Sequence, residues 1–276
     1  MSLERGYKWG RHLPRPVRAL VRPLANRYFE LSGYPLAGAL AGCRMRGKVI
    51  GSYREGSYEP EVCQTIMRIV QLGWVCVDVD AHVGYFTLLL AKLVGERGRV
   101  IALEAHPENV EQLRSNVRIN GYEARVQMEN MAVSDGTCQW VKLFPGRGHS
   151  SAEWNIVGHD VERNPTQAEL EVPATSLDAY FPSGSRVDFV KMDIEGVEAK
   201  ALRGMRRLLR DGRPFVLVEF HDENCWSGRQ ELLIAHYCLY DIRNARWLDG
   251  ELDVQRVYHC LAVPRERLAD IGLGGS

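Results

Sequence analysis

The stretch from Val75 to Thr87 constrains the fold of this chain more than any other part of the sequence. Its first half alternates Val75, Val77 and Val79 with other residues, which predicts a short β-strand. Gly84 then precedes a run of apolar residues, which indicates a tight turn that opens a helix. A buried strand that enters a helix through a glycine turn is typical of the nucleoside-binding edge of a doubly wound sheet. The sequence therefore predicts an α/β fold.

Three acidic residues lie at the ends of predicted strands. Asp78 lies where the first strand runs out, and Glu104 ends the next hydrophobic strand, which covers residues 99–103. Asp193 ends a later strand that begins at residue 186. The carboxyl ends of parallel strands meet at one edge of a sheet, where ligands bind in this architecture. We therefore expect the carboxylates of Asp78, Glu104 and Asp193 to converge on a single nucleoside-sized cleft.

The composition is that of an ordinary globular protein. The chain has 276 residues, of which 45% are hydrophobic and 25% charged, so it can bury a full core. Its formal net charge is zero, which gives no overall attraction to nucleic acid. The seven cysteines form no Cys-x-x-Cys pair, which favours the reducing cytoplasm. No apolar run reaches the roughly 18 residues of a transmembrane helix.

Further periodic segments complete the predicted α/β pattern. We expect residues 51–59 to form a turn-rich connector and residues 145–173 to form either a short strand pair or, as we favour, a substrate-side loop. The other predicted elements are helices from Pro60 to Gly73, Pro107 to Asn120 and Gly196 to Gly212, strands at 125–133 and 214–221, a helix opened by the capping box Ser227-x-x-Gln230, and a terminal antiparallel hairpin at 240–246 and 256–264.

Residues 1–50 are strongly basic, and we assign them to an N-terminal extension that precedes a catalytic domain at residues 51–276. Pro16 can open a helix whose apolar face would comprise Val17, Leu20, Val21, Leu24, Tyr28 and Leu31. Such a basic amphipathic segment could make weak peripheral contact with an anionic membrane or an acidic substrate. We favour the alternative, a helical cap over the sheet whose arginines are simply solvated.

Six short motifs follow one another in a characteristic order. They are Tyr58-Glu59-Pro60, Asp78-Val79-Asp80-Ala81-His82-Val83-Gly84-Tyr85-Phe86-Thr87, Glu104-Ala105-His106-Pro107-Glu108-Asn109, Leu113-Arg114-Ser115-Asn116, Thr175-Ser176-Leu177-Asp178 and Lys191-Met192-Asp193-Ile194-Glu195-Gly196-Val197-Glu198. In this order they resemble the FkbM family of S-adenosylmethionine-dependent methyltransferases over roughly residues 50 to 265.

The resemblance implies a Rossmann-like class I methyltransferase fold, with a seven-stranded, mostly parallel sheet whose terminal strand is antiparallel, plus the helical N-terminal cap. It implies O-methylation of a hydroxyl on a sugar or small natural product, with S-adenosylmethionine as cofactor. In this reading Glu104 holds the ribose hydroxyls and Asp193 lies beside the sulfonium. The cofactor-binding residues that it implies are Glu59, Asp78, Asp80, Ala81, Gly84, Glu104, Ala105, Asn130, Met131, Ala132 and Asp193.

Two positions depart from the family pattern. Asp80 replaces a glycine that lets the backbone approach the cofactor, and His82 replaces an asparagine. A carboxylate at position 80 could pair with the ammonium of the methionine portion but would repel its carboxylate. A different hypothesis makes Asp78, Asp80 and His82 a metal site, but we disfavour it because a strand exit in this fold bends immediately.

Methyl transfer to oxygen requires alignment and removal of a hydroxyl proton. The candidate catalytic residues are Asp193, Glu195, His221 and His149. Asp193, Glu219, His221 and Asp222 are candidate ligands for Mg²⁺, because they lie at the exits of two neighbouring strands. A purely structural interpretation has Glu195 and Glu198 complementing a helix N-terminus and Lys191 exposed on its strand.

Two other functional classes compete with methyl transfer. An NAD-dependent oxidoreductase shares the layout, but it expects Gly-x-Gly-x-x-Gly, and the run from Asp80 to Gly84 keeps one glycine. The other is a non-catalytic protein of the methyltransferase fold in which Asp80 impairs cofactor binding. For the favoured class we expect a small-molecule or glycan acceptor, no nucleic acid partner, a possible homodimer and a cytoplasmic location.

Overall fold

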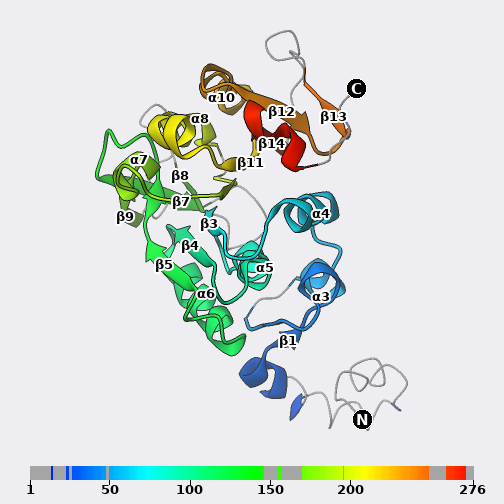
Figure 1. The fold of residues 1–276 in the computed structure, drawn as a ribbon. Helices are drawn as coiled ribbons and strands as arrows, with labels where there is room; N and C mark the ends of the chain where they lie inside the picture. The colour runs from blue at the N-terminus through cyan, green and yellow to red at the C-terminus, as the bar shows by residue number, and fades with distance from the viewer. Residues whose placement is uncertain are drawn as a thin grey trace.

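The computed structural model describes residues 14, 23–24, 27–47, 50–145, 154–156, 170–194, 196–248 and 259–271. Within them, a central sheet of eight strands runs in the order β13-β12-β14-β11-β10-β3-β4-β5 (Figure 1). Its strands are β3 (Val75–Val79), β4 (Arg99–Glu104), β5 (Val126–Asn130), β10 (Phe189–Met192), β11 (Phe215–Glu219), β12 (Tyr237–Asp241), β13 (Arg246–Trp247) and β14 (His259–Pro264).

The sheet is parallel from β5 to β11 and antiparallel beyond it. β14 pairs antiparallel with β11 on one side and with β12 on the other, which confirms the predicted terminal hairpin. Without the two-residue β13, this is the expected seven-stranded, mostly parallel sheet of a class I methyltransferase fold. The chain runs outward from β3 through β4 to β5 and resumes on the other side at β10. The carboxyl ends of β3 and β10 therefore form the topological switch point, where ligands bind in open α/β sheets.

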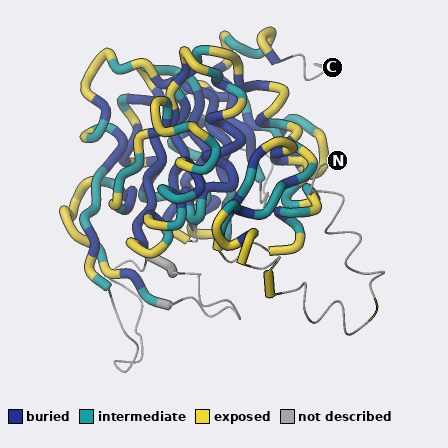
Figure 2. Tube along the Cα trace, turned by 90° about the horizontal axis from the view of Figure 1, so that it is seen from below, coloured by how far each residue is buried: buried dark blue, intermediate teal, exposed yellow. Residues whose placement is uncertain are grey.

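Helices cover both faces of the sheet. The helices are α3 (Gly51–Glu55), α4 (Pro60–Ile69), α5 (Tyr85–Val94), α6 (Pro107–Ile119), α7 (Leu177–Tyr180), α8 (Glu198–Arg203), α9 (Glu223–Trp226) and α10 (Arg229–Ile234), with shorter turns η1 (Gly38–Leu40), η2 (Leu208–Gly212) and η4 (Arg265–Asp270). Along β3, Cys76 packs into the core beneath α4, α5 and α6, whereas Val77 packs into the core beneath α8 and α10. This alternation of neighbouring side chains follows from the two-residue period of a strand. Figure 2 shows the buried residues gathered in the interior between these layers.

Two predictions about local structure are wrong. The segment expected to be a turn-rich connector contains the five-residue helix α3, which ends at Gly56 in the left-handed conformation. The predicted capping box at Ser227 does not form, because the Ser227 hydroxyl donates to the Asn224 carbonyl instead. The side chain of Asp222 caps the preceding helix α9 by accepting the Cys225 N–H. The following helix, α10, begins after Gly228 without a side-chain cap.

The segment favoured as a loop contains strands. β7 (Trp140–Pro145), β8 (Trp154–Ile156) and β9 (Leu170–Thr175) join β6 (Ala132–Val133) in a second sheet of order β6-β9-β7-β8. The antiparallel pairing of β7 with β8 agrees with the other predicted possibility for this segment, a short strand pair. His149 lies outside the described residues.

Part of the described N-terminal segment packs on helix α6. The hairpin of β1 (Tyr34–Pro35) and β2 (Arg44–Met45) is tied to α6, since the Arg44 N–H donates to Asn120 Oδ1 over 2.9 Å. Of the predicted apolar face, the described residues Leu24, Tyr28 and Leu31 are exposed. Phe29 is the buried residue of this helical turn. Among the described residues, no helix combines the length and apolar character needed to span a bilayer.

Candidate active site

The loop between β3 and α5 keeps a left-handed backbone at both positions that depart from the family pattern. Asp80 has a φ of 61° and His82 a φ of 50°. Glycine and asparagine adopt this conformation readily, and aspartate and histidine are among the other residues enriched in it. Both departures therefore preserve the course of the backbone. Gly84, with a φ of 94°, is needed for packing as well, since an added Cβ would lie 2.5 Å from Leu113 Cδ1.

Asp78 is completely buried within β3. The Thr87 hydroxyl, on the first turn of α5, donates a hydrogen bond of 2.6 Å to Asp78 Oδ2. Burial raises the pKa of the Asp78 carboxyl, against the opposing influence of the Lys191 charge. Asp78 Oδ1 has no hydrogen-bond partner among the described residues. A buried acceptor without a donor is uncommon in proteins and is suited to receive one from a ligand.

Glu104 ends β4 and holds the loop in place. Its carboxylate accepts the N–H of His82 over 2.7 Å and the N–H of His106 over 2.8 Å, and Asn109 donates a third hydrogen bond over 3.2 Å. Burial raises the pKa of Glu104, although these hydrogen bonds act in the opposite direction. A carboxylate offers about four acceptor positions, so about one is left for a ribose hydroxyl.

Three of the residues implied for the cofactor, Asn130, Met131 and Ala132, follow at the end of β5, beside β4 and Glu104. The Asn130 side-chain amide donates to the Glu104 carbonyl over 3.1 Å and to the Ala105 carbonyl over 2.8 Å, which joins the ends of β4 and β5. Ala105 and Ala132 are buried, and Met131 is half-buried. Ala81 is also buried, and its N–H donates to the Leu103 carbonyl over 3.1 Å.

Lys191 is the buried cation at the centre of the site. It stands opposite Asp78 in the parallel pairing of β10 with β3, and its Nζ lies 3.2 Å from Asp193 Oδ2. The interpretation of Lys191 as an exposed strand residue is wrong, because its side chain is only 5% exposed. Burial alone lowers the pKa of Lys191, but the charges of Asp193 and Asp78 outweigh it and raise the pKa.

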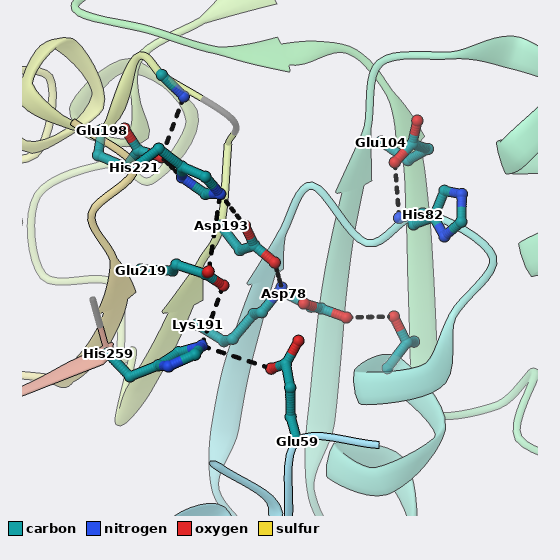
Figure 3. Close-up of polar contacts among 12 residues, drawn as sticks. Glu59, Asp78, His82, Glu104, Lys191, Asp193, Glu198, Glu219, His221 and His259 are labelled. Atoms are coloured by element: carbon teal, nitrogen blue, oxygen red, sulfur yellow. Dashed lines mark hydrogen bonds and ion pairs between the residues drawn. The ribbon is translucent and has the colours of Figure 1, made fainter. Parts of the chain in front are cut away.

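Asp193 remains ionised. Burial alone would raise the pKa of its carboxyl, but the nearby Lys191 and His221 reverse this and lower the pKa. The negative charge of Asp193 contributes to the raised pKa of Asp78, and the negative charge of Asp78 contributes to the raised pKa of Glu104. Figure 3 shows Glu104 with His82 on one side of Asp78 and the group around Asp193 on the other. The three strand-end acids thus share an edge of the sheet but have different immediate partners.

A histidine and a buried glutamate adjoin Asp193. His221 follows β11, and its Nδ1 lies 2.6 Å from Oε1 of Glu198, a fully buried residue in the first turn of α8. His221 Nε2 lies 3.5 Å from Asp193 Oδ1. Glu198 therefore does more than complement the helix N-terminus, because it fixes the orientation of the imidazole.

A second histidine, which the motifs did not indicate, lies on the other side of Glu219. His259 begins β14 and is the direct cross-strand partner of Glu219. Its Nε2 lies 3.1 Å from Glu219 Oε2 and 3.7 Å from Glu59 Oε2 (Figure 3). Burial alone lowers the pKa of His259, but its hydrogen bond to Glu219 and the charge of Glu59 raise it. Glu59 stands at the N-cap position of α4 with a φ of 39°, and its side chain makes no capping hydrogen bond to the helix.

Two sets of side chains within the described residues have the arrangement of metal ligands. Asp193, Glu219 and His221 form one set, Glu59, Glu219 and His259 form the other, and the ligand atoms within each lie within 4.8 Å of one another. The fourth predicted ligand, Asp222, belongs to neither set and caps α9. Mg²⁺ prefers oxygen ligands, whereas each set offers an imidazole nitrogen, so the donor set suits a transition metal better. Among the predicted catalytic residues, Glu195 and His149 lie outside the described residues.

The chain is similar to several known methyltransferases. The curated Protein-L-isoaspartate O-methyltransferase of Aeropyrum pernix is 42% identical over 67 residues, so the chain spans about a quarter (25%) of that relative and the match covers 24% of this chain. Among solved structures, an FkbM methyltransferase from Methylobacillus flagellatus KT has 19% identity and a TM-score of 0.46, with 68% of this chain and 43% of that chain covered. A SAM-dependent O-methyltransferase from Thermotoga maritima has 13% identity and a TM-score of 0.43, with 79% of this chain and 66% of that chain covered.

The family model described as the Methyltransferase FkbM domain matches residues 78–242, which are more than half of the 276 residues. The match begins at Asp78 and includes Glu104, Asp193 and His221. The chain belongs to the FkbM methyltransferase domain family.

Proposed function

We propose that this chain is an S-adenosylmethionine-dependent O-methyltransferase that acts on a hydroxyl group of a sugar or another small natural product. Membership of the FkbM methyltransferase family supports the transfer of a methyl group. The observation that carries the choice of oxygen is the pair of His221 and Glu198, because methylation of a hydroxyl requires a base that removes its proton.

The residues around β3 and β4 fit the methyl donor. Asp78 Oδ1 is a buried acceptor without a partner in the described part of the chain, and Glu104 retains about one acceptor position at the end of β4. Asp78 would face the methionine and ribose portion, and Glu104 would accept a ribose hydroxyl. The donor supplies an electrophilic methyl group on a sulfonium when it is bound.

Each residue of the group around Asp193 has a separate task in this proposal. When His221 carries its proton on Nδ1, it donates to Glu198, and its Nε2 then serves as the acceptor for the substrate proton. The lowered pKa of Asp193 makes this carboxylate a weak base, but the carboxylate keeps its negative charge. That charge would balance the positive charge that develops on His221 and would orient the substrate hydroxyl. Lys191 holds Asp193 in position by its bond to Oδ2.

The direct test is methyl transfer from labelled S-adenosylmethionine to a panel of glycosides and hydroxylated small molecules, with the methylated atom identified by mass spectrometry and NMR. His221→Gln and Glu198→Gln should each lower kcat, by about a hundredfold to ten-thousandfold for the loss of the base itself. His236→Asn is the matched control, because His236 is an exposed histidine outside the site whose φ of 60° asparagine tolerates.

Binding measurements separate the competing classes. Calorimetric titration should show binding of S-adenosylmethionine and of its demethylated product but not of NAD. Binding of NAD alone would favour an oxidoreductase, and a lack of binding for all three would favour a non-catalytic protein. Methylation of nitrogen or sulfur acceptors with unchanged rates in His221→Gln would contradict the proposed choice of oxygen.

A further inference from the structure

Three side chains from distant parts of the sequence meet beside the proposed active site. Glu59 comes from the start of α4, Glu219 from the end of β11 and His259 from the start of β14. His259 Nε2 lies 3.1 Å from Glu219 Oε2 and 3.7 Å from Glu59 Oε2, and all three ligand atoms lie within 4.8 Å of one another. Ligand atoms that surround one ion at about 2.0–2.2 Å are separated by about 3–4 Å, so small adjustments suffice.

The surroundings of these side chains carry an excess of negative charge. Among the residues labelled in Figure 3, Lys191 is the single lysine or arginine, and the charges of Asp193, Asp78 and Glu59 act on it. The carboxylates of Glu198 and Glu219 lie beside His221 and His259. Asp78 and Glu198 are fully buried, while Glu59 and Glu219 have side chains that are 22% and 18% exposed. Carboxylates withdrawn from water are normally paired or bound to metal, and besides Lys191 the partners here are the imidazoles of His221 and His259, so the group is suited to a divalent cation.

The two candidate ligand sets share Glu219 but differ in their other neighbours. Glu219 directs Oε2 toward His259, and its Oε1 lies 3.8 Å from His221 Nε2. In the set around Asp193, the Lys191 ammonium already bonds to the carboxylate, and it would repel an incoming cation. His221 in that set is also held by Glu198. Within the described residues, Lys191 makes no hydrogen bond to Glu59, Glu219 or His259, although its charge also acts on Glu59 from a greater distance.

The donor atoms indicate the class of ion. An imidazole nitrogen with two carboxylates suits Mn²⁺, Co²⁺ or Zn²⁺, whereas Mg²⁺ prefers oxygen ligands throughout. Three protein ligands also leave positions open for water or for another oxygen ligand. We propose that Glu59, Glu219 and His259 bind one divalent transition-metal ion. This site stands independently of methyl transfer, because it requires neither methyl donor nor acceptor.

The site also has a place in the geometry of the proposed reaction. Because Glu219 is shared, an ion bound to it lies next to Asp193 and His221. A metal ion lowers the pKa of a bound oxygen acid, so a hydroxyl ligand of the ion would lose its proton more readily. The chain would then combine an acidified hydroxyl with the base formed by His221 and Glu198.

The test measures metal binding to the full chain after removal of metal by a chelator and dialysis. Titration with Co²⁺, followed by its visible absorption, and calorimetric titration with Zn²⁺ and Mg²⁺ should give one Co²⁺ or Zn²⁺ ion per chain. Zn²⁺ should bind at least about tenfold more tightly than Mg²⁺. His259→Gln and Glu59→Gln should each weaken Co²⁺ binding by at least about tenfold and change its spectrum.

Matched variants separate this site from its neighbour. Glu61→Gln removes an exposed carboxylate in the first turn of the same helix and should leave Co²⁺ binding unchanged. His221→Gln should keep the affinity close to that of the original chain, with circular dichroism confirming the fold of each variant. The proposal is overturned if the chain binds no ion, if Glu61→Gln weakens binding as much as Glu59→Gln, or if His221→Gln abolishes binding while His259→Gln keeps it.

Discussion

The ammonium of Lys191 lies 3.2 Å from the carboxylate of Asp193, and the lysine side chain is only 5% exposed. The two residues are separated by one position at the end of β10, where Lys191 also stands opposite Asp78 in the sheet. The Lys191 ammonium lies 4.9 Å from the centre of the Phe86 ring. A single buried cation thus faces carboxylates from two neighbouring strands, so the stability of this edge and its chemistry depend on the same residue.

Replacement of Lys191 by methionine should destabilise the fold. Lys191→Met leaves Asp193 and Asp78 without their buried counter-charge, which typically costs about 3–5 kcal/mol. The free energy of unfolding in urea measures this loss. Lys92→Met is the control, because Lys92 is exposed and its replacement should cost less than about 1 kcal/mol. Equal losses of unfolding free energy in the two variants would show that the buried charge of Lys191 does not stabilise the fold.

Replacement of Asp193 by asparagine should abolish methyl transfer and leave the fold intact. The variant keeps the size of the side chain but removes the negative charge that Lys191 and His221 hold in its ionised form. We expect kcat to fall by at least about a hundredfold, measured with labelled methyl donor, with an unchanged circular dichroism spectrum. Asp211→Asn removes an exposed aspartate and serves as control. Unchanged turnover in Asp193→Asn would exclude Asp193 from the mechanism.

Replacement of Asp80 by glycine should tighten binding of S-adenosylmethionine. Asp80 has a φ of 61°, which glycine adopts without strain, and the substitution removes a charge that would repel the carboxylate of the methionine portion. A repulsion of up to about 1 kcal/mol corresponds to at most about a fivefold change in Kd. Calorimetric titration checks this, and Asp80→Asn separates the effect of charge from that of size. Weaker binding in Asp80→Gly would mean that the acid takes part in binding.

The contact between Arg213 and Glu266 should make stability depend on acid pH. Two hydrogen bonds, of 2.7 and 2.8 Å, join the guanidinium of Arg213 to both oxygens of Glu266 and lower the pKa of that carboxyl from 4.5 to about 2. A lowered pKa means that the stabilisation is complete above pH 4.5 and is lost as the pH falls toward 2.

Glu266→Gln should therefore cost less than about 1 kcal/mol at pH 7, because the pair is exposed to solvent. The difference from the original chain in urea unfolding should shrink at pH 3. Glu111→Gln, another exposed glutamate, gives the baseline. A difference that stays constant between pH 7 and pH 3 would show that the charge of Glu266 is not the source of the stabilisation.

Local pattern predicted the framework of the fold well. The alternation of valines in β3, the proline at the start of α4 and the glycine before α5 are each signals that act over a few residues, and the structure has these elements where they were expected. The capping box at Ser227 and the connector at residues 51–59 were predicted wrongly. In both places the neighbouring residues can form several alternative turns and caps. A short motif therefore does not decide where the helix begins.

The sequence by itself determined the strands and helices of the central sheet around β3, β4 and β10 and put Asp78, Glu104 and Asp193 at one edge of that sheet, because strand ends follow from local hydrophobic periodicity. Only the tertiary structure showed that Lys191 is buried, that Glu198 holds His221, and that His259 faces Glu219 across 40 positions of the chain. The last pairing depends on the antiparallel register of β14 with β11, which forms between strands distant in sequence and carries no local signature. The charges that surround Lys191 are likewise brought together by the packing of separate strands, and no stretch of sequence contains them all.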